Sequence, residues 1–343
     1  MDSRVRIGIV GATGYVGAEL VRALSRHKGF EITALVSQSY AGKPFSDIYP
    51  SLRGIADIPC SVLDIEAVAS KCDVVVTALP HGVSSGVVPV LLDRGLRFLD
   101  HSGDFRYKNK DTYEKAYKLT HPAPGLLAES VYGLPELYRD EIAGARLVAD
   151  PGCYPTCSLL ALVPLLKRGL AEPSSIIIDA VSGITGAGRK ADITYNFCET
   201  SENFKAYSVT GHRHTSEIEE ILLRKTGITT ALTFTPHLAP IMRGMLATVY
   251  TQVPSGKGPA ELRAAYEQDY GDEFFIRFLP ESTVPETRNV VNSNFADISF
   301  FYDGRTGRAT ILSAIDNLGK GASLQAVQAL NIMFGFGESE GLI

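Results

Sequence analysis

The sequence lacks the features that mark membrane and secreted proteins. It has no apolar run of about 18 residues, the length with which a helix crosses a bilayer. The start of the chain does not read as a signal peptide, because the short apolar run at 5–10 is followed by glycines rather than by a cleavage site of small residues. It also has no repeat, low-complexity tract or long charged linker. We therefore expect a globular protein that neither spans nor binds a membrane.

The sequence is also poor in cysteine. The five cysteines are Cys60, Cys72, Cys153, Cys157 and Cys198, an odd number at irregular spacing. No two of them form the C-x-x-C pair of a zinc or redox site. This usage is typical of a reducing compartment rather than of a disulfide framework, so we expect a cytoplasmic protein.

Neither sign of charge dominates. The 343 residues include 33 Lys and Arg against 38 Asp and Glu, a net charge of −5. Such a chain is a poor electrostatic match for nucleic acid or anionic lipid, and we expect neither as a partner. Hydrophobic residues make up 45% and charged residues 21%, an ordinary globular balance. At about 150 residues per domain, the length suggests two domains.

The first half of the chain alternates strands and helices. We expect strands at 4–11, 31–37, 73–80 and 97–100 and helices at 15–26, 64–71 and 83–94. The strands are continuous apolar runs, which is typical of parallel strands buried on both faces. The pattern predicts an α/β fold with a Rossmann-type, doubly wound parallel sheet.

Near residue 150 the pattern changes to an α+β one. We expect a helix after Pro155, a strand at 176–183, a helix at 215–226, strands at 231–238 and 245–253, and a hairpin of 295–302 and 308–316. A closing amphipathic helix at 321–335 has Leu324, Val327, Leu330 and Phe334 on one stripe. After the hairpin, little apolar surface of the second domain is left for this helix to cover. We therefore predict one domain of residues 1–149 plus about 321–343, and a second domain of residues 150–320.

A glycine-rich turn joins the first strand to the first helix. It contains Gly11, Thr13, Gly14, Tyr15, Val16 and Gly17. Glycines at this junction permit a tight turn, close approach of the backbone to a pyrophosphate, and close helix–strand packing, while the helix N-terminus faces the anion. The spacing is G-x-x-G-x-x-G rather than G-x-G-x-x-G, but its place between strand and helix favours a dinucleotide site over a purely structural turn.

The second strand indicates which dinucleotide binds. NAD-specific sites usually place Asp or Glu at the end of this strand to hold the ribose hydroxyls. Here the strand ends in Ser37 and Ser39 with Lys43 nearby, and no carboxylate. Hydroxyls and a cation suit the 2′-phosphate of NADP. The alternative is that these residues lie on a loop and bind no ligand. We expect the first domain to bind NADP.

One cysteine has the setting of a nucleophile. Cys153 lies in the segment DPGCYPT, just before a predicted helix. Free amides and the helix dipole stabilise a thiolate there and lower the thiol pKa, whereas most cysteines are simply small buried hydrophobes. Such a thiol can hold an acyl group as a thioester beside a nicotinamide, which can then deliver a hydride to it. A dinucleotide fold with this cysteine therefore predicts a reductase of acyl derivatives.

Several segments together resemble one enzyme family. They are GATGYVGAEL (11–20), ALPHG (78–82), DHSGDFR (100–106), VYGLPE (131–136), PGCYPT (151–156), SGITGAGR (182–189), GHRHTSEI (211–218), FTPHLAPIMRG (234–244) and DNLGKGAS (316–323). Over essentially its whole length the chain is similar to the N-acetyl-γ-glutamyl-phosphate reductases of arginine biosynthesis. PGCYPT followed by GHRHT is the specific combination. The resemblance implies that the second domain carries substrate and dimer contacts in a homodimer or homotetramer.

The resemblance implies a reaction at Cys153. The thiol attacks the γ-acyl phosphate and releases phosphate, and NADPH reduces the resulting thioester to N-acetylglutamate 5-semialdehyde. Release of the aldehyde needs a general acid/base of near-neutral pKa, a role that suits histidine. His212 and His214 lie at the start of a predicted helix, with Glu217 one turn on. One histidine would serve Cys153 while the other orients the substrate; a surface cluster or a metal site is the alternative, although no third ligand cluster is evident.

The anionic groups of the substrate should meet arginines. Arg106 resembles the phosphate-binding arginine of the related semialdehyde dehydrogenases. Arg189 follows the glycine-rich loop 183–188 and is a candidate for the carboxylate, with a salt bridge or simple solvation as its alternative. The remaining expected cofactor contacts are Pro80, Ser182, Gly183 and Asn317. We expect no metal.

Three positions depart from the family pattern. Asp150 stands where Asn is usual, Gly103 where Ala is usual, and Leu324 where Gly is usual. The first could alter the hydrogen bonds beside Cys153. The other hypotheses are an aspartate-semialdehyde dehydrogenase, a carrier-linked aminoadipyl-phosphate reductase of lysine synthesis, and, from another class, a redox-sensing NADP-binding regulator. Retention of Cys153 with both histidines argues against the regulator.

Overall fold

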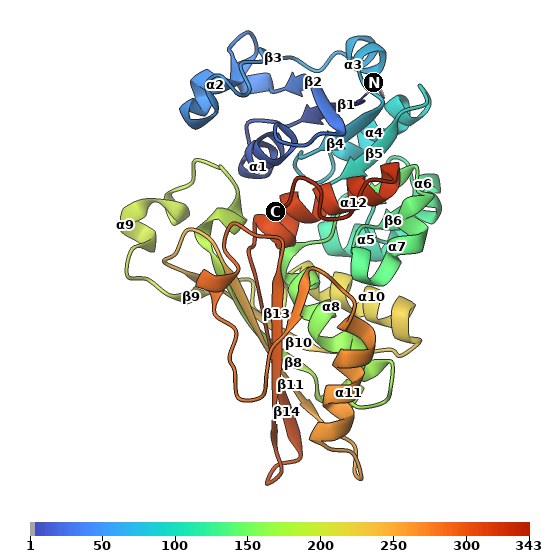
Figure 1. The fold of residues 1–343 in the computed structure, drawn as a ribbon, viewed down its shortest axis with the longest axis vertical. Coiled ribbons are helices and arrows are strands. Elements are labelled where there is room, and N and C mark those ends of the chain that lie inside the picture. The colour runs from blue at the N-terminus through green and yellow to red at the C-terminus, as the bar shows by residue number, and fades with distance from the viewer. Residues whose placement is uncertain (1–3) are drawn as a thin grey trace. The chain divides into compact units, whose positions relative to one another are not determined.

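The computed structural model describes residues 4–343, and the chain forms two compact units (Figure 1). The first unit comprises the chain up to Pro151 together with Ala322–Ile343, and the second comprises Gly152–Gly321. None of the helices within residues 4–343 is long and apolar enough to cross a membrane.

The first unit is built on a parallel sheet of seven strands. They are β1 (Val5–Val10), β2 (Phe30–Val36), β3 (Cys60–Ser61), β4 (Val74–Thr77), β5 (Arg97–Asp100), β6 (Val131–Tyr132) and β7 (Leu147–Ala149). Their order is β3-β2-β1-β4-β5-β7-β6, and every pairing is parallel. The direction of winding therefore reverses between β1 and β4, which confirms the predicted doubly wound sheet. Ligands of such sheets bind at this switch point, beside the carboxyl ends of the strands.

Helices connect these strands. They are α1 (Tyr15–Leu24), α2 (Phe45–Ile48), α3 (Ile65–Lys71), α4 (Ser84–Leu92), α5 (Lys110–Tyr117), α6 (Gly125–Glu129), α7 (Pro135–Ala143) and α12 (Leu324–Phe334). The central strands are apolar because helices cover both faces of the sheet: Ile7, Ile9 and Val75 are fully buried. The sequence pattern gives no regular elements between 101 and 149, where the structure has three helices and two strands. These strands are only two or three residues long, too short to show a period.

The closing helix α12 belongs to the first unit, where it packs against α1 and α7. The helix is buried on more than its apolar stripe, since Gln325, Gln328 and Asn331 are also buried. The Asn331 amide donates to the backbone carbonyls of Glu338 and Glu340, at 3.1 and 2.9 Å. Hydrogen bonds of this kind compensate for burial of the polar side chains of α12. The apolar stripe in the sequence does not indicate that this polar side is buried too.

The second unit has a mixed sheet of seven strands. They are β8 (Ile177–Gly183), β9 (Lys205–Ala206), β10 (Thr233–Ala239), β11 (Met245–Gln252), β12 (Ile276–Phe278), β13 (Ala296–Asp303) and β14 (Arg308–Ile315), in the order β12-β13-β14-β11-β8-β10-β9. The pairs β8–β10 and β12–β13 are parallel and the others are antiparallel. The α+β character of this unit is thus as predicted, and β13 and β14 form the expected hairpin.

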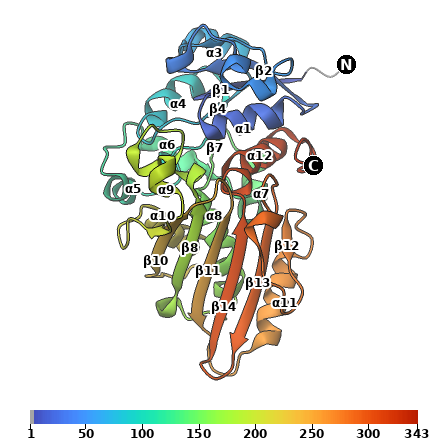
Figure 2. The same cartoon turned by 90° about the vertical axis from the view of Figure 1, so that its left-hand side faces the viewer.

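The helices of the second unit are α8 (Cys153–Leu166), α9 (Phe197–Thr200), α10 (His214–Thr226) and α11 (Pro259–Tyr270). Figure 2 shows α8, α10 and α11 on one face of this sheet. Helix α8 packs against β11 and β14 on one side and against α10 and α11 on the other. All of its residues after Cys153 are buried, as expected of a helix that is apolar all round. This packing fixes the end of the helix at which Cys153 lies.

Candidate active site

The glycine turn of the first unit has the geometry of a dinucleotide cradle. Gly11 has φ +88°, and a β-carbon there would stand 2.3 Å from the Ala78 carbonyl oxygen. A β-carbon on Gly17 would stand 2.5 Å from the Ala12 carbonyl oxygen, whereas the nearest atom to one on Gly14 is 3.6 Å away. The outer glycines are thus required by the packing of the turn, and the middle one leaves room for a ligand. No side chain caps the first turn of α1, so its amides suit a pyrophosphate.

The residues after β2 lie next to this turn. The hydroxyls of Thr13 and Ser37 are 2.7 Å apart, while Ser39 and Lys43 are exposed. Tyr15 and Val16 are partly exposed at the start of α1, and Pro80 is exposed in the loop between β4 and α4. The structure therefore brings the predicted cofactor residues of the first unit to the carboxyl ends of β1, β2 and β4.

Cys153 is the first residue of α8, so the helix begins before Pro155 and not after it as predicted. Gly152, in extended conformation, is its N-cap and provides no side-chain cap. Of the five cysteines, Cys60, Cys72 and Cys157 are buried and Cys198 is exposed, while Cys153 is intermediate. Burial raises the pKa of the Cys157 thiol to about 12. Cys153 therefore combines access with the helix amides that stabilise a thiolate.

The imidazole of His214 lies against the turn that presents Cys153. A β-carbon on Gly152 would stand 2.5 Å from Nε2 of His214. His214 is the first residue of α10 and is buried. Glu217, one turn further on, is also buried, and its Oε1 accepts a hydrogen bond from the Gly152 N–H at 2.9 Å. A thiol, an imidazole and a carboxylate thus meet at the junction of α8 and α10.

His212 has a different setting. Its Nδ1 accepts a hydrogen bond from the His214 N–H at 3.1 Å, which caps the start of α10. Its ring packs edge-on against Tyr154, Tyr207 and Phe234, with centroids 5.5 to 5.7 Å apart. Burial, together with the charge of Arg213, lowers the pKa of His212 to about 4. At neutral pH this imidazole is therefore uncharged.

Two tyrosines line the same part of the second unit. The Tyr207 hydroxyl donates to that of Tyr154 at 3.2 Å, and the Tyr154 hydroxyl donates to the His237 carbonyl at 3.1 Å. Burial raises the pKa of Tyr207 to about 12 and that of Tyr154 still further. Both phenols stay protonated through the neutral range and form an uncharged wall around the histidines.

The predicted residues Ser182, Gly183 and Asn317 come together within the second unit. The Asn317 amide donates to the Thr185 hydroxyl and accepts from the Gly244 N–H, both at 2.9 Å. A β-carbon on Gly183 would stand 2.7 Å from the Met242 carbonyl oxygen. The loops after β8, β10 and β14 therefore form one tightly packed cluster.

Arg243 and Asp316, which are not among the predicted site residues, also belong to this cluster. The Arg243 side chain pairs with the fully buried carboxylate of Asp316 at 2.8 Å. The N–H of Gly321 donates to the backbone carbonyl of Asp316 at 2.9 Å, and a β-carbon on Gly321 would stand 2.9 Å from Cβ of Cys153. Arg243 and Asp316 are widely separated in the chain, so the only sequence signal was that each lies in a segment resembling the family.

The two predicted arginines occupy different settings. Arg106, in the first unit, is buried, and its guanidinium donates to the backbone carbonyls of Asp150 and His101 at 2.8 and 2.9 Å. Asp150 itself is fully buried, and its carboxylate lies 2.9 Å from Nδ1 of His101. Arg189, in the second unit, is exposed. Nowhere in residues 4–343 do three or more His, Cys, Asp or Glu side chains gather as metal ligands.

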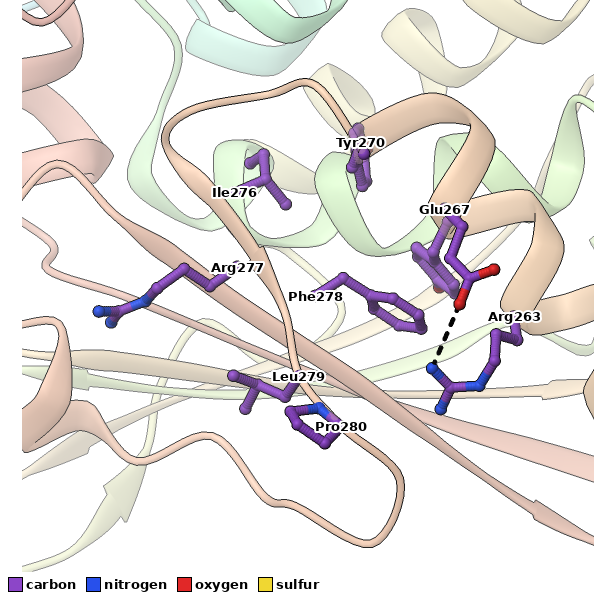
Figure 3. Close-up of a pocket in the computed structure, with 10 residues that line it drawn as sticks. Arg263, Glu267, Tyr270, Ile276, Arg277, Phe278, Leu279 and Pro280 are labelled. Carbon is purple, nitrogen blue, oxygen red and sulfur yellow. Dashed lines mark ion pairs between the residues drawn. The ribbon is translucent and has the colours of Figure 1, made fainter.

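A pocket of about 410 Å³ lies between α11 and β12 (Figure 3). Its lining includes Tyr266, Phe278 and Arg263, and the Arg263 guanidinium stands 5.0 Å from the centroid of the Phe278 ring. An ion pair of 3.6 Å joins Arg263 to Glu267 across its rim. None of the predicted site residues lines this pocket.

Known proteins resemble the chain over nearly its full length. Residues 6–145 match the semialdehyde dehydrogenase NAD-binding domain, and residues 153–317 match the semialdehyde dehydrogenase dimerisation domain. An N-acetyl-γ-glutamyl-phosphate reductase of Acetivibrio thermocellus is 54% identical, covering 98% of this chain and 97% of its own. Its counterpart in Pelotomaculum thermopropionicum is 50% identical, covering 98% of this chain and 97% of its own. The chain belongs to the N-acetyl-γ-glutamyl-phosphate reductase family.

Solved structures of more distant enzymes have a similar fold. Aspartate semialdehyde dehydrogenase II of Vibrio cholerae, complexed with ASA, has a TM-score of 0.75 at 16% identity and covers 97% of this chain and 99% of its own. Aspartate semialdehyde dehydrogenase of Candida albicans, with NADP, has a TM-score of 0.73 with the same identity and coverage. At this identity the likeness concerns the fold alone. Membership of the family confirms the predicted resemblance and, with it, a nicotinamide dinucleotide as cofactor.

Proposed function

We propose that this chain reduces N-acetyl-γ-glutamyl phosphate to N-acetylglutamate 5-semialdehyde and phosphate, with NADPH as reductant and Cys153 as nucleophile. The observation that carries the proposal is the meeting of Cys153, at the start of α8, with His214, whose Nε2 faces the Gly152 α-carbon. Members of the family named for this substrate supply the substrate class.

Cys153 begins the reaction by attacking the γ-acyl carbon as a thiolate. The new S–C bond forms as the C–O bond to phosphate breaks, and phosphate leaves with the bonding electron pair. His214 takes the thiol proton at Nε2, and the amides of the first turn of α8 stabilise the negative sulfur. When bound, the dinucleotide supplies the hydride. His214 later moves a proton as Cys153 leaves the product carbon and the aldehyde is released.

His212 supports the start of α10 in this scheme. Its Nδ1 accepts the His214 N–H, and its pKa of about 4 leaves it uncharged at neutral pH. A group that titrates so low is a weak acid/base at pH 7. Between the two predicted histidines we therefore assign acid/base catalysis to His214. Replacing His214 by Asn should slow turnover by roughly 10²–10⁴, the usual scale for a lost general acid/base.

The preference for NADPH rests on the end of β2. Ser39 and Lys43 are exposed there, and Ser37 is held by Thr13. No carboxylate occurs between 37 and 43 to repel a 2′-phosphate. The glycine turn fits the pyrophosphate, as its geometry requires a bare α-carbon at Gly11 and Gly17 and leaves space at Gly14. On the second unit, we propose that Ser182, Gly183 and Asn317 line the nicotinamide side.

Arg106 and Arg189 are the proposed contacts for the anionic groups of the substrate. Two backbone carbonyls orient the Arg106 guanidinium, and a fixed guanidinium recognises a phosphate in one geometry. Arg189 follows Gly188, whose φ of +81° bends the chain after the loop at 184–187. Replacing Arg106 by Lys should raise KM for the acyl phosphate more than KM for NADPH.

A homodimer, or a homotetramer built from it, is the proposed assembly. Helices α8, α10 and α11 cover one face of the second sheet (Figure 2). Ile177 and Tyr250, exposed by 45 and 38%, alternate with buried residues of their strands, and the strand register places Phe301, 36% exposed, in the same row. The match of 153–317 to a dimerisation domain supports a second copy as the occupant of this face. Light scattering should give twice or four times the 37.0 kDa chain mass, and Tyr250→Asp should yield monomers.

One assay panel tests the proposed reaction. Reduction of NADP+ is followed in the reverse direction with phosphate and N-acetylglutamate semialdehyde, and with aspartate semialdehyde as the competing substrate. We expect phosphate-dependent reduction with the acetylated substrate alone. Preference for aspartate semialdehyde would contradict the proposal.

A reducing compartment, the cytoplasm, is the proposed site of action, since the thiol of Cys153 must stay reduced to react.

A further inference from the structure

We propose that Glu217 is a positioning residue of this active site. Its carboxylate holds the Gly152 peptide so that the thiol of Cys153 faces His214. The proposal rests on the function proposed above for Cys153 and His214. Its test includes measurements that require neither substrate nor turnover, so the two can fail separately.

Glu217 occupies a place on α10 that packing alone would give to an apolar side chain. His214, Glu217, Ile218 and Ile221 follow the i, i+3, i+4, i+7 spacing of one helix face, and all four are buried. This face packs on α8. Burial of a carboxylate is unfavourable unless strong hydrogen bonds compensate for lost water. Glu217, only 1% exposed, accepts such a bond from the Gly152 N–H at 2.9 Å.

Gly152 needs an anchor because glycine has few conformational limits of its own. The structure holds it at three points. Its N–H donates to Glu217, its carbonyl accepts from the N–H and the hydroxyl of Thr156 at 2.9 and 3.1 Å, and its α-carbon lies against His214. The peptides on both sides of the Gly152 α-carbon are therefore held, and Gly152 has one orientation. Loss of the Glu217 contact frees the Pro151–Gly152 peptide, and in this proposal it lets Sγ turn away from the imidazole.

A purely structural role is the competing explanation, and the same helix offers a matched control. Glu219 is half-buried, and its Oε1 accepts the Leu232 N–H at 3.1 Å. It thus makes the same kind of carboxylate–amide bond, away from the turn of the nucleophile. If Glu217 only stabilises α10, then loss of either carboxylate should have similar effects. If Glu217 positions Cys153, only its own loss should affect the reactivity of the thiol.

The experiment compares Glu217→Ala, Glu217→Gln and Glu219→Ala in the full-length enzyme. For each, the rate of Cys153 alkylation by iodoacetamide is measured from pH 6 to 9 without substrate, together with kcat, KM for NADPH and Tm. The other titratable or charged groups around Cys153 and His214 are the same in all variants: Tyr154, Tyr207, His212 and Arg213. Differences in the pH profile therefore report Glu217.

We expect Glu217→Ala to lower both kcat and the alkylation rate on the order of ten- to a hundredfold, the scale of a misplaced reacting group, with KM for NADPH unchanged. Glu217→Gln, whose amide oxygen still accepts from Gly152, should recover most of both rates. Glu219→Ala should match the wild type in both. Alkylation of Glu217→Ala at the wild-type rate, no rescue by Gln, or an equal loss in Glu219→Ala would overturn the proposal. A wild-type enzyme that is alkylated normally but reduces no acyl phosphate would overturn the proposed function instead.

Discussion

The α-carbon of Gly152 lies against the imidazole of His214, and a β-carbon there would stand 2.5 Å from Nε2. This contact leaves no room for any side chain at 152, although the backbone there is in an ordinary extended conformation, with φ −68° and ψ 151°. The glycine before the nucleophile is thus required by its neighbour and not by its own dihedral angles. The contact ties the geometry of the turn to the position of the proposed acid/base.

Gly152→Ala should therefore separate the two catalytic groups. The added methyl forces either the imidazole or the turn of α8 to move, and a displacement of about 1 Å can lower kcat by about a hundredfold. Affinity for NADPH should not change, because the glycine turn of the first unit is intact. Gly144→Ala is the control, since a β-carbon there meets nothing within 4 Å. Stopped-flow kinetics and NADPH titration of both variants check this, and a Gly152→Ala enzyme with wild-type kcat would refute it.

His212 should make the protein less stable in acid. Its pKa is lowered from 6.5 to about 4 in the folded state, mainly by burial. The unfolded chain therefore binds a proton between these pH values that the folded chain rejects. This contribution to stability is complete above pH 6.5 and is lost as the pH falls to about 4, a change on the order of 3 kcal/mol. Urea unfolding at pH 7.5 and 4.5 should show a smaller acid loss in His212→Asn than in the wild type; equal losses would contradict the assignment.

Cofactor preference should depend on the exposed residues after β2. Ser39→Asp places a carboxylate where the 2′-phosphate of NADPH is proposed to bind, and should weaken NADPH while leaving NADH little affected. A hydrogen bond to a charged group contributes about 1.5–3 kcal/mol, so we expect at least tenfold loss in the ratio of kcat/KM for NADPH over NADH. Ser70→Asp, at a distant exposed site on α3, is the control. An unchanged ratio would show that the 2′-phosphate binds elsewhere.

Tyr117 leaves no space for a side chain at Gly103. A β-carbon at 103 would stand 1.8 Å from the Tyr117 hydroxyl oxygen, so alanine, the residue expected here from the family resemblance, is incompatible with this tyrosine position. Gly103→Ala should lower the free energy of unfolding by about 1–3 kcal/mol, the range for overpacking. Adding Tyr117→Leu should recover part of that loss. Additive losses in the double variant would show that the two residues do not compete for space.

Much of this fold can be predicted from the sequence because its strands and helices have strong local patterns. Apolar runs such as 73–80 indicate buried parallel strands, and the glycine spacing at 11–17 indicates how the first strand meets its helix. The short strands β6 and β7 and the helix α7 between them lack such a period. They are stabilised by position in the sheet rather than by local sequence.

The site residues could be predicted where the residues that act together lie close together in the sequence. The segment around Cys153 and the pair His212 and His214 both have recognisable local settings. The difference between the two histidines is not local: it arises from the aromatic cage around His212 and from the contact of His214 with Gly152. The hydrogen bond of Glu217 joins residues 65 positions apart, and only the packing of α10 on α8 brings them together.

The most direct test of this account asks where the acyl group attaches. The enzyme is mixed with N-acetyl-γ-glutamyl phosphate without NADPH, quenched in acid and digested for mass spectrometry. We predict an N-acetylglutamyl adduct on Cys153 and on no other cysteine, together with release of phosphate. Cys153→Ser should form no adduct and lose turnover while still binding NADPH, because a serine hydroxyl provides almost no anion near pH 7. An adduct on Cys157 or Cys198, or turnover by Cys153→Ser near the wild-type rate, would contradict the account.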